Sequence, residues 1–289
     1  MSNQLENQNI FEHIIATKFS LPKKQQQLCD YILKNPQELG LLTVKELASN
    51  SGVGTTTVMR LLKVLGFDSF FDLKKEFHHI QTDYSEKWEY VQKSFGNSDD
   101  NKAYQTLSTV WNEGIELLDK SLNPRLVENF TMAMDLISAA ERINILGLRP
   151  YKAAAVYLEL LIEEFYSKTR QLSHDTESMI DRILQFNNNE VVIIFGFDPY
   201  TQRTIDAAKV AHQQEVPIIL ITDHLSCPIA RYSSIILKVE PSVKHFTMIP
   251  TIALIEAIVI DLGKRNSEVS IQRIRTLMDT LKENKIVVN

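Results

Sequence analysis

Small polar and basic side chains share one face of a short helix that the sequence predicts from about Thr55. Side chains of this kind can read the DNA major groove, because arginine bonds guanine at two atoms, threonine methyl groups contact thymine, and lysine binds phosphate. The residues concerned are Thr55, Thr56, Thr57, Met59, Arg60 and Lys63. The same types also fit the solvated face of any short helix, so a protein-interaction head stays open as an alternative. A steep fall of binding with salt would distinguish DNA.

The opposite face of this helix carries an apolar stripe that must be buried against neighbouring helices. Its members recur at the i, i+3, i+4 and i+7 positions, and they are Val58, Leu61, Leu62 and Leu65. Gly66 stands where a glycine commonly ends a helix. An earlier helix begins at a capping box, Thr43 to Glu46, and residues 50–54 form a turn between the two helices. This arrangement predicts a helix-turn-helix.

Charge is distributed unevenly along the 289 residues. The chain has 31 basic and 36 acidic residues and a formal charge of −5. Residues 18–80 contain nine basic and six acidic residues, a charge of +3, which leaves −8 for the remainder. A basic N-terminal region on an acidic body favours a DNA-binding head, because phosphate neutralisation supplies much of the affinity of such proteins.

Several protein classes are excluded by motifs that the sequence lacks. Its nine glycines assemble neither the G-x-G-x-x-G of dinucleotide-binding enzymes nor the P-loop of NTPases. The apolar run at 249–262 is too short for a membrane span and is interrupted by Pro250 and Glu256. The N-terminus lacks the pattern of a secretory signal, and Cys29 and Cys227 are too few for a disulfide framework or a cysteine metal site. We therefore expect a cytoplasmic protein with no membrane partner, metal or cofactor.

From Asn123 onward, apolar segments of strand length alternate with helical segments. The expected strands are residues 142–147, 169–172, 191–195, 216–221 and 234–239. Among the expected helices, one covers 69–80, one begins at Pro124 with Asn123 as its cap, and one covers 175–185. Strands buried on both faces and separated by helices form a parallel sheet with right-handed crossovers. The predicted fold is an all-α helix-turn-helix head followed by an α/β domain, a flavodoxin-like αβα sandwich with a five-stranded parallel sheet. The expected domains are the head at 1–80, a helical linker at 81–122 and the sandwich at 123–289.

The segment from Leu42 to Phe77, LTVKELASNSGVGTTTVMRLLKVLGFDSFFDLKKEF, resembles the helix-turn-helix of the RpiR/MurR family of bacterial transcriptional regulators. The resemblance is carried by T-V-x-R at 57–60, L-G-F at 65–67, Phe70 and L-K at 73–74. Members of that family have a C-terminal sugar-isomerase (SIS) domain, a five-stranded αβα sandwich. The resemblance implies a DNA-binding regulator of carbohydrate metabolism that acts as a homodimer or tetramer on a palindromic operator. One departure is Gly54, where the family usually has a serine that caps the recognition helix.

The resemblance also implies an effector site at the carboxyl ends of the strands, where SIS domains typically bind phosphosugars. The first loop usually reads G-x-G-x-S, and here it is Gly147-Leu148-Arg149-Pro150-Tyr151. The second usually reads S-x-S-G-x-T, and here it is Gly196-Phe197-Asp198-Pro199-Tyr200-Thr201. Only Thr201 keeps a hydroxyl at its expected place. We expect Asp198 to cap a helix that begins at Pro199, and its charge would repel a phosphate.

Three interpretations of this site stay open. In the first, Arg149 and Lys152 replace the lost hydroxyls and bind an anionic effector such as a sugar phosphate, while Tyr151 and Phe197 stack on its ring. In the second, the site is vestigial and the domain serves only dimerisation. An ordinary phosphosugar pocket is the third. The residues assigned to ligand binding are Gly147, Arg149, Tyr151, Lys152, Gly196, Asp198 and Thr201.

A different class, a phosphosugar isomerase on the same fold, would need a base beside the sugar carbon. The candidate bases are Glu159, His174, His245 and Glu256. Each has a simpler explanation as a helix-surface or loop residue, and the phosphate loops have lost their serines. We therefore expect no catalytic residues and no enzymatic activity.

Overall fold

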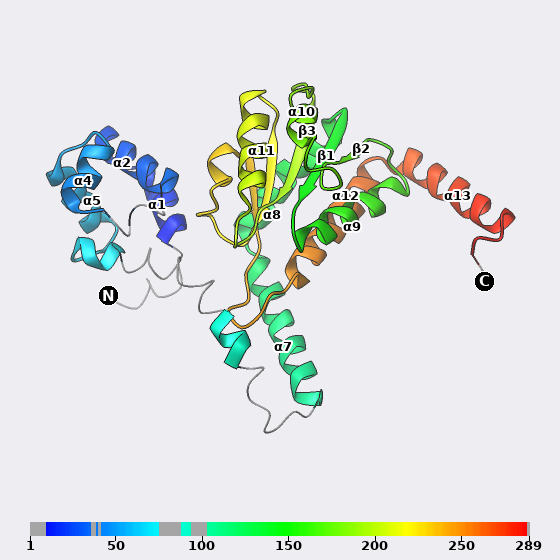
Figure 1. The fold of residues 1–289 in the computed structure, drawn as a ribbon, viewed down its shortest axis with the longest axis horizontal. Coiled ribbons are helices and arrows are strands. Elements are labelled where there is room, and N and C mark those ends of the chain that lie inside the picture. The colour runs from blue at the N-terminus through cyan, green and yellow to red at the C-terminus, as the bar shows by residue number, and fades with distance from the viewer. Residues whose placement is uncertain (1–9, 36–38, 40–41, 75–87, 94–102, 288–289) are drawn as a thin grey trace. The chain divides into compact units, whose positions relative to one another are not determined.

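The computed structural model describes residues 10–35, 39, 42–74, 88–93 and 103–287, and they fall into two compact units (Figure 1). The first unit holds the N-terminal helices up to residue 97, and the second holds the sheet with its helices. No helix among the described residues is long and apolar enough to cross a membrane.

The described residues of the N-terminal unit are mainly helical, and four helices have both ends described. They are α1 (Ile10–Lys18), α2 (Lys23–Lys34), α4 (Val44–Asn50) and α5 (Thr55–Val64). Its core joins Leu28 and Ile32 of α2 to Leu47 of α4 and to the predicted stripe of α5, and all of these side chains are buried. A fourth helix was expected at 69–80, and residues 70–74 are helical while the rest of that range lies outside the described residues.

Two sequence signals fix the ends of the helices in the helix-turn-helix. The capping box is confirmed, because Thr43 Oγ1 accepts the Glu46 N–H at 3.3 Å and Glu46 Oε2 accepts the Thr43 N–H at 2.7 Å. At the end of α5, Gly66 adopts a φ of 82°, which a residue with a Cβ rarely adopts. The Phe67 N–H then bonds the Leu62 carbonyl at 2.9 Å and closes the helix.

The second unit is built on a five-stranded parallel sheet, as predicted, and its strand order is β2-β1-β3-β4-β5 (Figure 1). The strands are β1 (Arg142–Gly147), β2 (Thr169–Gln171), β3 (Glu190–Phe195), β4 (Ile218–Thr222) and β5 (Ile235–Lys238). The order reverses between β1 and β3, so the loops after these two strands border the crevice where α/β proteins bind ligands.

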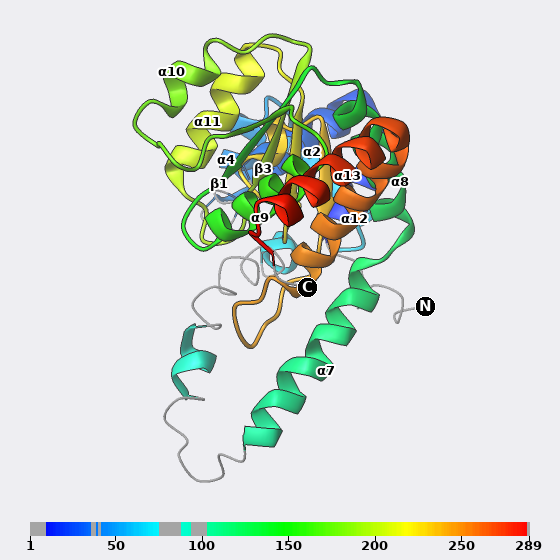
Figure 2. The ribbon, with the colours of Figure 1, turned by 90° about the vertical axis from the view of Figure 1, so that its right-hand side faces the viewer.

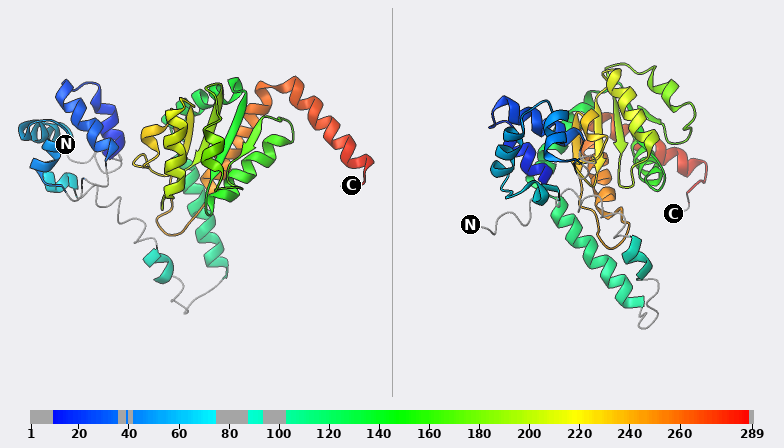
Figure 3. Two further views of the ribbon diagram at one scale, coloured as in Figure 1. Left: turned by 45° about the horizontal axis from the view of Figure 1, so that its top comes forward. Right: turned by 60° about the vertical axis from the view of Figure 1, so that its left-hand side comes forward.

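Helices cover both faces of the sheet and make a three-layer sandwich (Figure 3). One layer consists of α8 (Pro124–Ala139), α9 (Tyr151–Glu163) and α12 (Ile249–Arg265). The other consists of α10 (Met179–Ile183), α11 (Gln202–Gln213) and the 3₁₀ helix η1 (Ala230–Tyr232). Sequence analysis predicted a longer α10 over 175–185. It is shorter because the Asp175 carboxylate accepts the N–H groups of Glu177 and Ser178 and holds them in a turn.

Two long helices flank the sandwich (Figure 2). The helix α7 (Ala103–Ser121) falls within the stretch that sequence analysis assigned to a linker, and it packs on α12, where Gly114 faces the Ile249 side chain. The Ser242 hydroxyl also donates to Glu113 Oε1 of α7 at 2.5 Å. The C-terminal helix α13 (Ser267–Glu283) follows α12 and buries only Ser270.

Both cysteines are free and buried. Burial raises the pKa of the Cys29 thiol to about 11, with a further contribution from the Asp30 carboxylate. Burial likewise raises the pKa of Cys227 to about 12. Because the thiolate is the reactive form, a pKa raised by two units lowers the reactive fraction about 100-fold at neutral pH. We expect iodoacetamide to label the native protein at pH 8 at least about 100-fold more slowly than it labels a free thiol.

The check on this expectation is mass spectrometry of the labelled protein over time. Unfolding in urea is the control, since it removes the burial and should expose both thiols to rapid labelling. Rapid stoichiometric labelling of the native chain would contradict the buried positions.

Candidate DNA-binding surface and effector site

The helix α5 presents the predicted DNA-contacting residues on one side. Thr55, Thr56, Met59, Arg60 and Lys63 are exposed, and Thr57 is half-buried. Val58, Leu61 and Leu62 are buried on the other side, with at most 2% of any side chain exposed. The buried stripe therefore fixes the rotation of α5 about its axis and directs Arg60 and Lys63 to solvent.

The turn between α4 and α5 is held by side chains of α2, which sequence analysis did not assign to the site. Gln27 Nε2 donates to the Ser51 carbonyl at 2.8 Å, and Lys24 Nζ lies 3.3 Å from the Gly52 carbonyl oxygen. Gly52 has a φ of 67°, and Gly54 occupies the N-cap of α5 with no side-chain cap. The missing cap leaves the first N–H groups of α5 without a side-chain partner at its N-terminus.

At the carboxyl end of β1, the chain passes directly into α9. Gly147 is required there, because a Cβ would lie 2.3 Å from the Tyr151 carbonyl oxygen. The Gly147 N–H donates to Ser173 Oγ at 2.9 Å, so the loops after β1 and β2 are tied together. Arg149 is exposed with a φ of 55°, and Lys152 is half-buried in the first turn of α9. Both cations therefore stand at a helix N-terminus, where anions bind favourably.

Tyr151 and Phe197 come from the two ligand loops and stack on each other. Their ring centroids are 4.1 Å apart and the rings are inclined by 8°. Phe197 is only 6% exposed. Burial raises the pKa of the Tyr151 hydroxyl, and the carboxylates of Asp223 and Asp198 raise it further, which places both acids near this hydroxyl. The two aromatic residues that were expected to stack on a ligand ring therefore stack on each other in this structure.

The loop after β3 differs from the expectation for Asp198. Sequence analysis predicted that Asp198 caps a helix beginning at Pro199, but α11 begins at Gln202 with Thr201 in the N-cap position. Residues 198–200 instead lead from the strand to the helix, and the Asp198 carboxylate acts electrostatically on the Tyr151 hydroxyl. Gly196 lies under Ile229 and Leu220, whose side chains would be within 3.0 Å of a Cβ.

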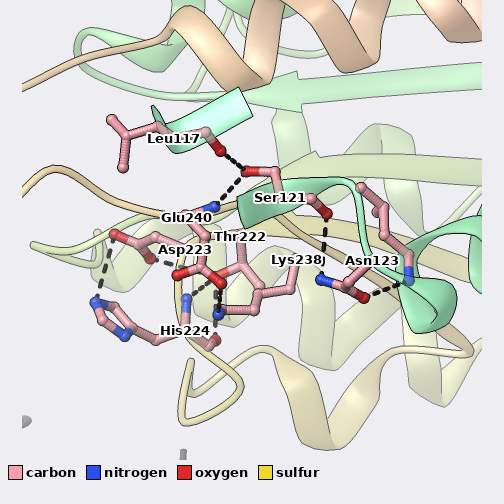
Figure 4. Close-up of polar contacts among 9 residues, drawn as sticks. Leu117, Ser121, Asn123, Thr222, Asp223, His224, Lys238 and Glu240 are labelled. Atoms are coloured by element: carbon pink, nitrogen blue, oxygen red, sulfur yellow. Dashed lines mark hydrogen bonds and ion pairs between the residues drawn. The ribbon is translucent and has the colours of Figure 1, made fainter. Parts of the chain in front are cut away.

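A further acid, Asp223, follows β4 and was missed by sequence analysis. It is 3% exposed, its Oδ1 lies 3.5 Å from Thr222 Oγ1, and its Oδ2 lies 3.9 Å from His224 Nε2 (Figure 4). On the neighbouring β5, Lys238 forms an ion pair with Glu240 at 2.5 Å. The signal that could have identified Asp223 is its place directly after a wholly apolar strand.

The end of α7 is fastened to this edge of the sheet. Ser121 Oγ accepts the Glu240 N–H at 2.9 Å and donates to the Leu117 carbonyl at 2.7 Å (Figure 4). Asn123 then caps α8 by accepting the Leu126 N–H at 3.0 Å, as predicted. These bonds fix the end of α7, and the start of α8 that follows it, beside the end of β5.

The candidate isomerase bases differ in their contacts and in their exposure to solvent. Glu159 Oε2 accepts Gln171 Nε2 at 3.1 Å, and burial raises the pKa of the Glu159 carboxyl. Glu256 Oε1 accepts the Tyr157 hydroxyl at 3.3 Å on the outer surface of α9 and α12. His174 is exposed and His245 is half-buried. Within the described part of the chain, no three His, Cys, Asp or Glu side chains are grouped to hold a metal ion.

Comparison with known proteins identifies both units. Residues 8–85 match the helix-turn-helix domain of the rpiR family, and residues 136–261 match the SIS domain. The transcriptional regulator HexR of Pseudomonas aeruginosa is 22% identical over 260 residues, which cover 88% of this chain and 87% of HexR. An uncharacterised helix-turn-helix regulator of Clostridium perfringens is 22% identical over 78% of this chain and 79% of its own length.

Two solved structures share the fold. Vibrio vulnificus NanR, determined in complex with ManNAc-6P, superposes with a TM-score of 0.58 at 15% identity and covers 97% of this chain and 100% of NanR. The sugar isomerase domain of an RpiR transcription factor from Sphaerobacter thermophilus superposes with a TM-score of 0.57 at 21% identity, over 61% of this chain and 99% of that domain. With its rpiR-type helix-turn-helix followed by a SIS domain, the chain belongs to the RpiR/MurR family of transcriptional regulators.

Proposed function

We propose that this protein is a transcriptional regulator of carbohydrate metabolism that reads an operator in the cytoplasm through α5. The observation that carries the proposal is the orientation of α5, whose apolar stripe is buried while Arg60 and Lys63 face solvent. A recognition helix held in this way can enter the major groove with its N-terminal residues against base edges. We assign Arg60 to a guanine, the threonines to thymine methyl groups and Lys63 to a phosphate.

The test is selection of bound duplexes from a random-sequence library by the full-length protein. We expect enrichment of one sequence made of two inverted half-sites, with centres about 10 base pairs or a multiple of a helical turn apart. Enrichment of unrelated sequences, or none, would contradict sequence-specific binding.

We expect inverted half-sites because we propose that the protein acts as a homodimer or tetramer. Large apolar side chains are exposed on both flanking helices of the SIS unit, and they include Leu107, Trp111 and Ile115 of α7 and Ile271, Ile274 and Met278 of α13. Trp111 is 67% exposed, which is unusual for so large an apolar side chain. Coverage of these helices by a second copy would bury them and give the two-fold symmetry that a palindromic operator requires.

For the SIS domain we propose a sugar-phosphate effector. Arg149, Lys152 and the N-terminus of α9 supply positive charge for the phosphate, in place of the missing serines. Asp198 and Asp223 lie near the Tyr151 hydroxyl and supply acceptors for sugar hydroxyl groups. The complex of NanR with ManNAc-6P supports this class of ligand. Such an effector would act on DNA binding through different affinities for two arrangements of the oligomer.

A thermal-shift screen of the full-length protein against sugar phosphates, nucleotides and uncharged sugars tests the effector. At 100 times its dissociation constant a ligand stabilises the protein by about 2.7 kcal/mol, which is several degrees for a domain of this size. We expect a sugar phosphate to raise the melting temperature and Arg149→Ala to remove that shift. Arg142→Ala, exposed at the start of β1 and thus at the opposite end of that strand from the effector site, is the charge-matched control and should leave it unchanged. No shift with any sugar phosphate would favour a domain that only dimerises.

A further inference from the structure

A groove runs along α2 beside the helix-turn-helix turn. It has a volume of about 540 Å³ and is bordered on α2 by Lys23, Gln27, Asp30 and Lys34, and at the end of α4 by Asn50 and Ser51. The α2 residues recur every three or four positions, so they occupy one face of the helix. The ammonium groups of Lys23 and Lys34 are the donors suited to an anionic chain, because the Gln27 amide and the Ser51 hydroxyl already donate to the Ser51 and Leu47 carbonyls.

The charge in and beside this groove is positive. Lys23 and Lys34 are exposed at opposite ends of α2. The one carboxylate among the lining residues, Asp30, is in an ion pair with Lys18 at 2.5 Å. Lys24 adds a third ammonium group at the turn, 3.3 Å from the Gly52 carbonyl oxygen. A polyanion that enters the groove would therefore meet cations without an uncompensated acid among the lining groups.

The groove is bordered by the segment of chain that leads into α5. Asn50 and Ser51 form its wall, and the same segment leads through Gly54 into α5. Gln27 fixes this junction through its bond to the Ser51 carbonyl. In a helix-turn-helix the N-terminal end of the recognition helix enters the major groove, so the preceding turn lies next to the sugar-phosphate backbone.

We propose that this α2 groove binds the DNA backbone beside the half-site that α5 reads, with Lys23 and Lys34 on separate phosphates of one strand. Lys34 follows Lys23 by eleven helical positions, a distance of about 16 Å along α2, whereas phosphates of one strand recur about every 3.4 Å along the duplex axis. The two lysines are therefore far enough apart to bind different phosphates, and each contact contributes separately to the affinity. The assignment rests on the proposed DNA-binding function and adds a second binding element outside α5.

The test compares the full-length protein with its Lys23→Gln/Lys34→Gln variant on the selected operator and on a random 30-base-pair duplex. Affinity is measured over a series of KCl concentrations. Each phosphate contact contributes about 0.9 to the slope of log affinity against log salt, so the variant should lose about 1.8 for each bound head. At 0.15 M salt this corresponds to about 30-fold weaker binding per head, equal for both duplexes.

Lys209→Gln/Lys264→Gln is the matched control, because it removes two exposed lysines, one of α11 and one of α12. It should retain the slope of the unmodified protein. Lys24 is left intact in the main variant so that the turn is not disturbed, and an unchanged melting temperature verifies the fold. An unchanged slope in the Lys23/Lys34 variant would overturn the groove assignment while leaving the proposed function intact. Absence of DNA binding by the unmodified protein would overturn both.

Discussion

Replacing Arg60 by alanine is expected to weaken operator binding by about 1–3 kcal/mol, roughly 5- to 150-fold. The reason is that Arg60 is exposed on the face of α5 opposite the buried stripe, where its guanidinium can bond two atoms of a guanine. The loss should be confined to specific binding, and one base position of the operator should become tolerant of substitution. The measurement is the dissociation constant for the selected operator and for its single-base variants.

A second substitution at Arg60 and a control distinguish the effect of the planar guanidinium group from the effect of its charge. Arg60→Lys keeps the charge and loses the planar fork, so it should restore general DNA affinity without restoring preference at the relaxed position. Arg142→Ala removes an exposed arginine at the start of β1 and should leave operator binding unchanged. Equal operator affinity in the Arg60→Ala variant and the unmodified protein would show that α5 does not lie in the groove as assigned.

Gly147→Ala is expected to destabilise the SIS domain by about 1–3 kcal/mol, a drop of roughly 2–12 °C in melting temperature. The added methyl group would lie 2.3 Å from the Tyr151 carbonyl oxygen and 2.9 Å from its carbonyl carbon. Both are backbone atoms, so the first turn of α9 must shift, and with it Arg149 and Lys152. The effector response should fall together with stability. Calorimetry of the full-length variant measures the first effect and ligand titration the second.

Gly263→Ala is the matched control for this substitution. Its Cβ would meet only ring atoms of Phe165 at 3.7 Å or more, an ordinary contact. Gly263 lies inside α12, where alanine is favoured over glycine by up to about 1 kcal/mol. We therefore expect unchanged or slightly higher stability. Equal stability of the Gly147→Ala and Gly263→Ala variants would contradict the close approach of Gly147 to the first turn of α9.

Most of the fold could be predicted because its signals are local. The wholly apolar strand at Val191 to Phe195 could only be a buried strand, and the alternation with helices fixed a parallel sheet. The capping box at Thr43 and the glycine at position 66 marked helix ends with recognisable chemistry. The incorrect helix prediction concerns a short element. The range 175–185 was read as one helix, but side-chain bonds to Asp175 form a turn there before α10 begins.

The site was less predictable because its geometry depends on contacts between distant loops. The residue types after β1 and β3 could be read from the sequence, but the stacking of Tyr151 on Phe197 depends on how the two loops meet. Asp198 looked like a helix cap because Asp-Pro is a common start of a helix, yet α11 begins four residues later. Asp223 carried no motif, and only the sheet order brings it near Tyr151.

The central claim is that this chain recognises a specific DNA sequence through its helix-turn-helix. Its most direct test is the ratio of dissociation constants for the selected operator and for a scrambled duplex of equal length and composition, measured with the full-length protein at 0.15 M salt. Specific regulators bind their sites about 10³-fold or more tightly than other DNA. We expect a ratio of at least about 10³. A ratio near one would mean that the head binds DNA by charge alone, and it would contradict the account.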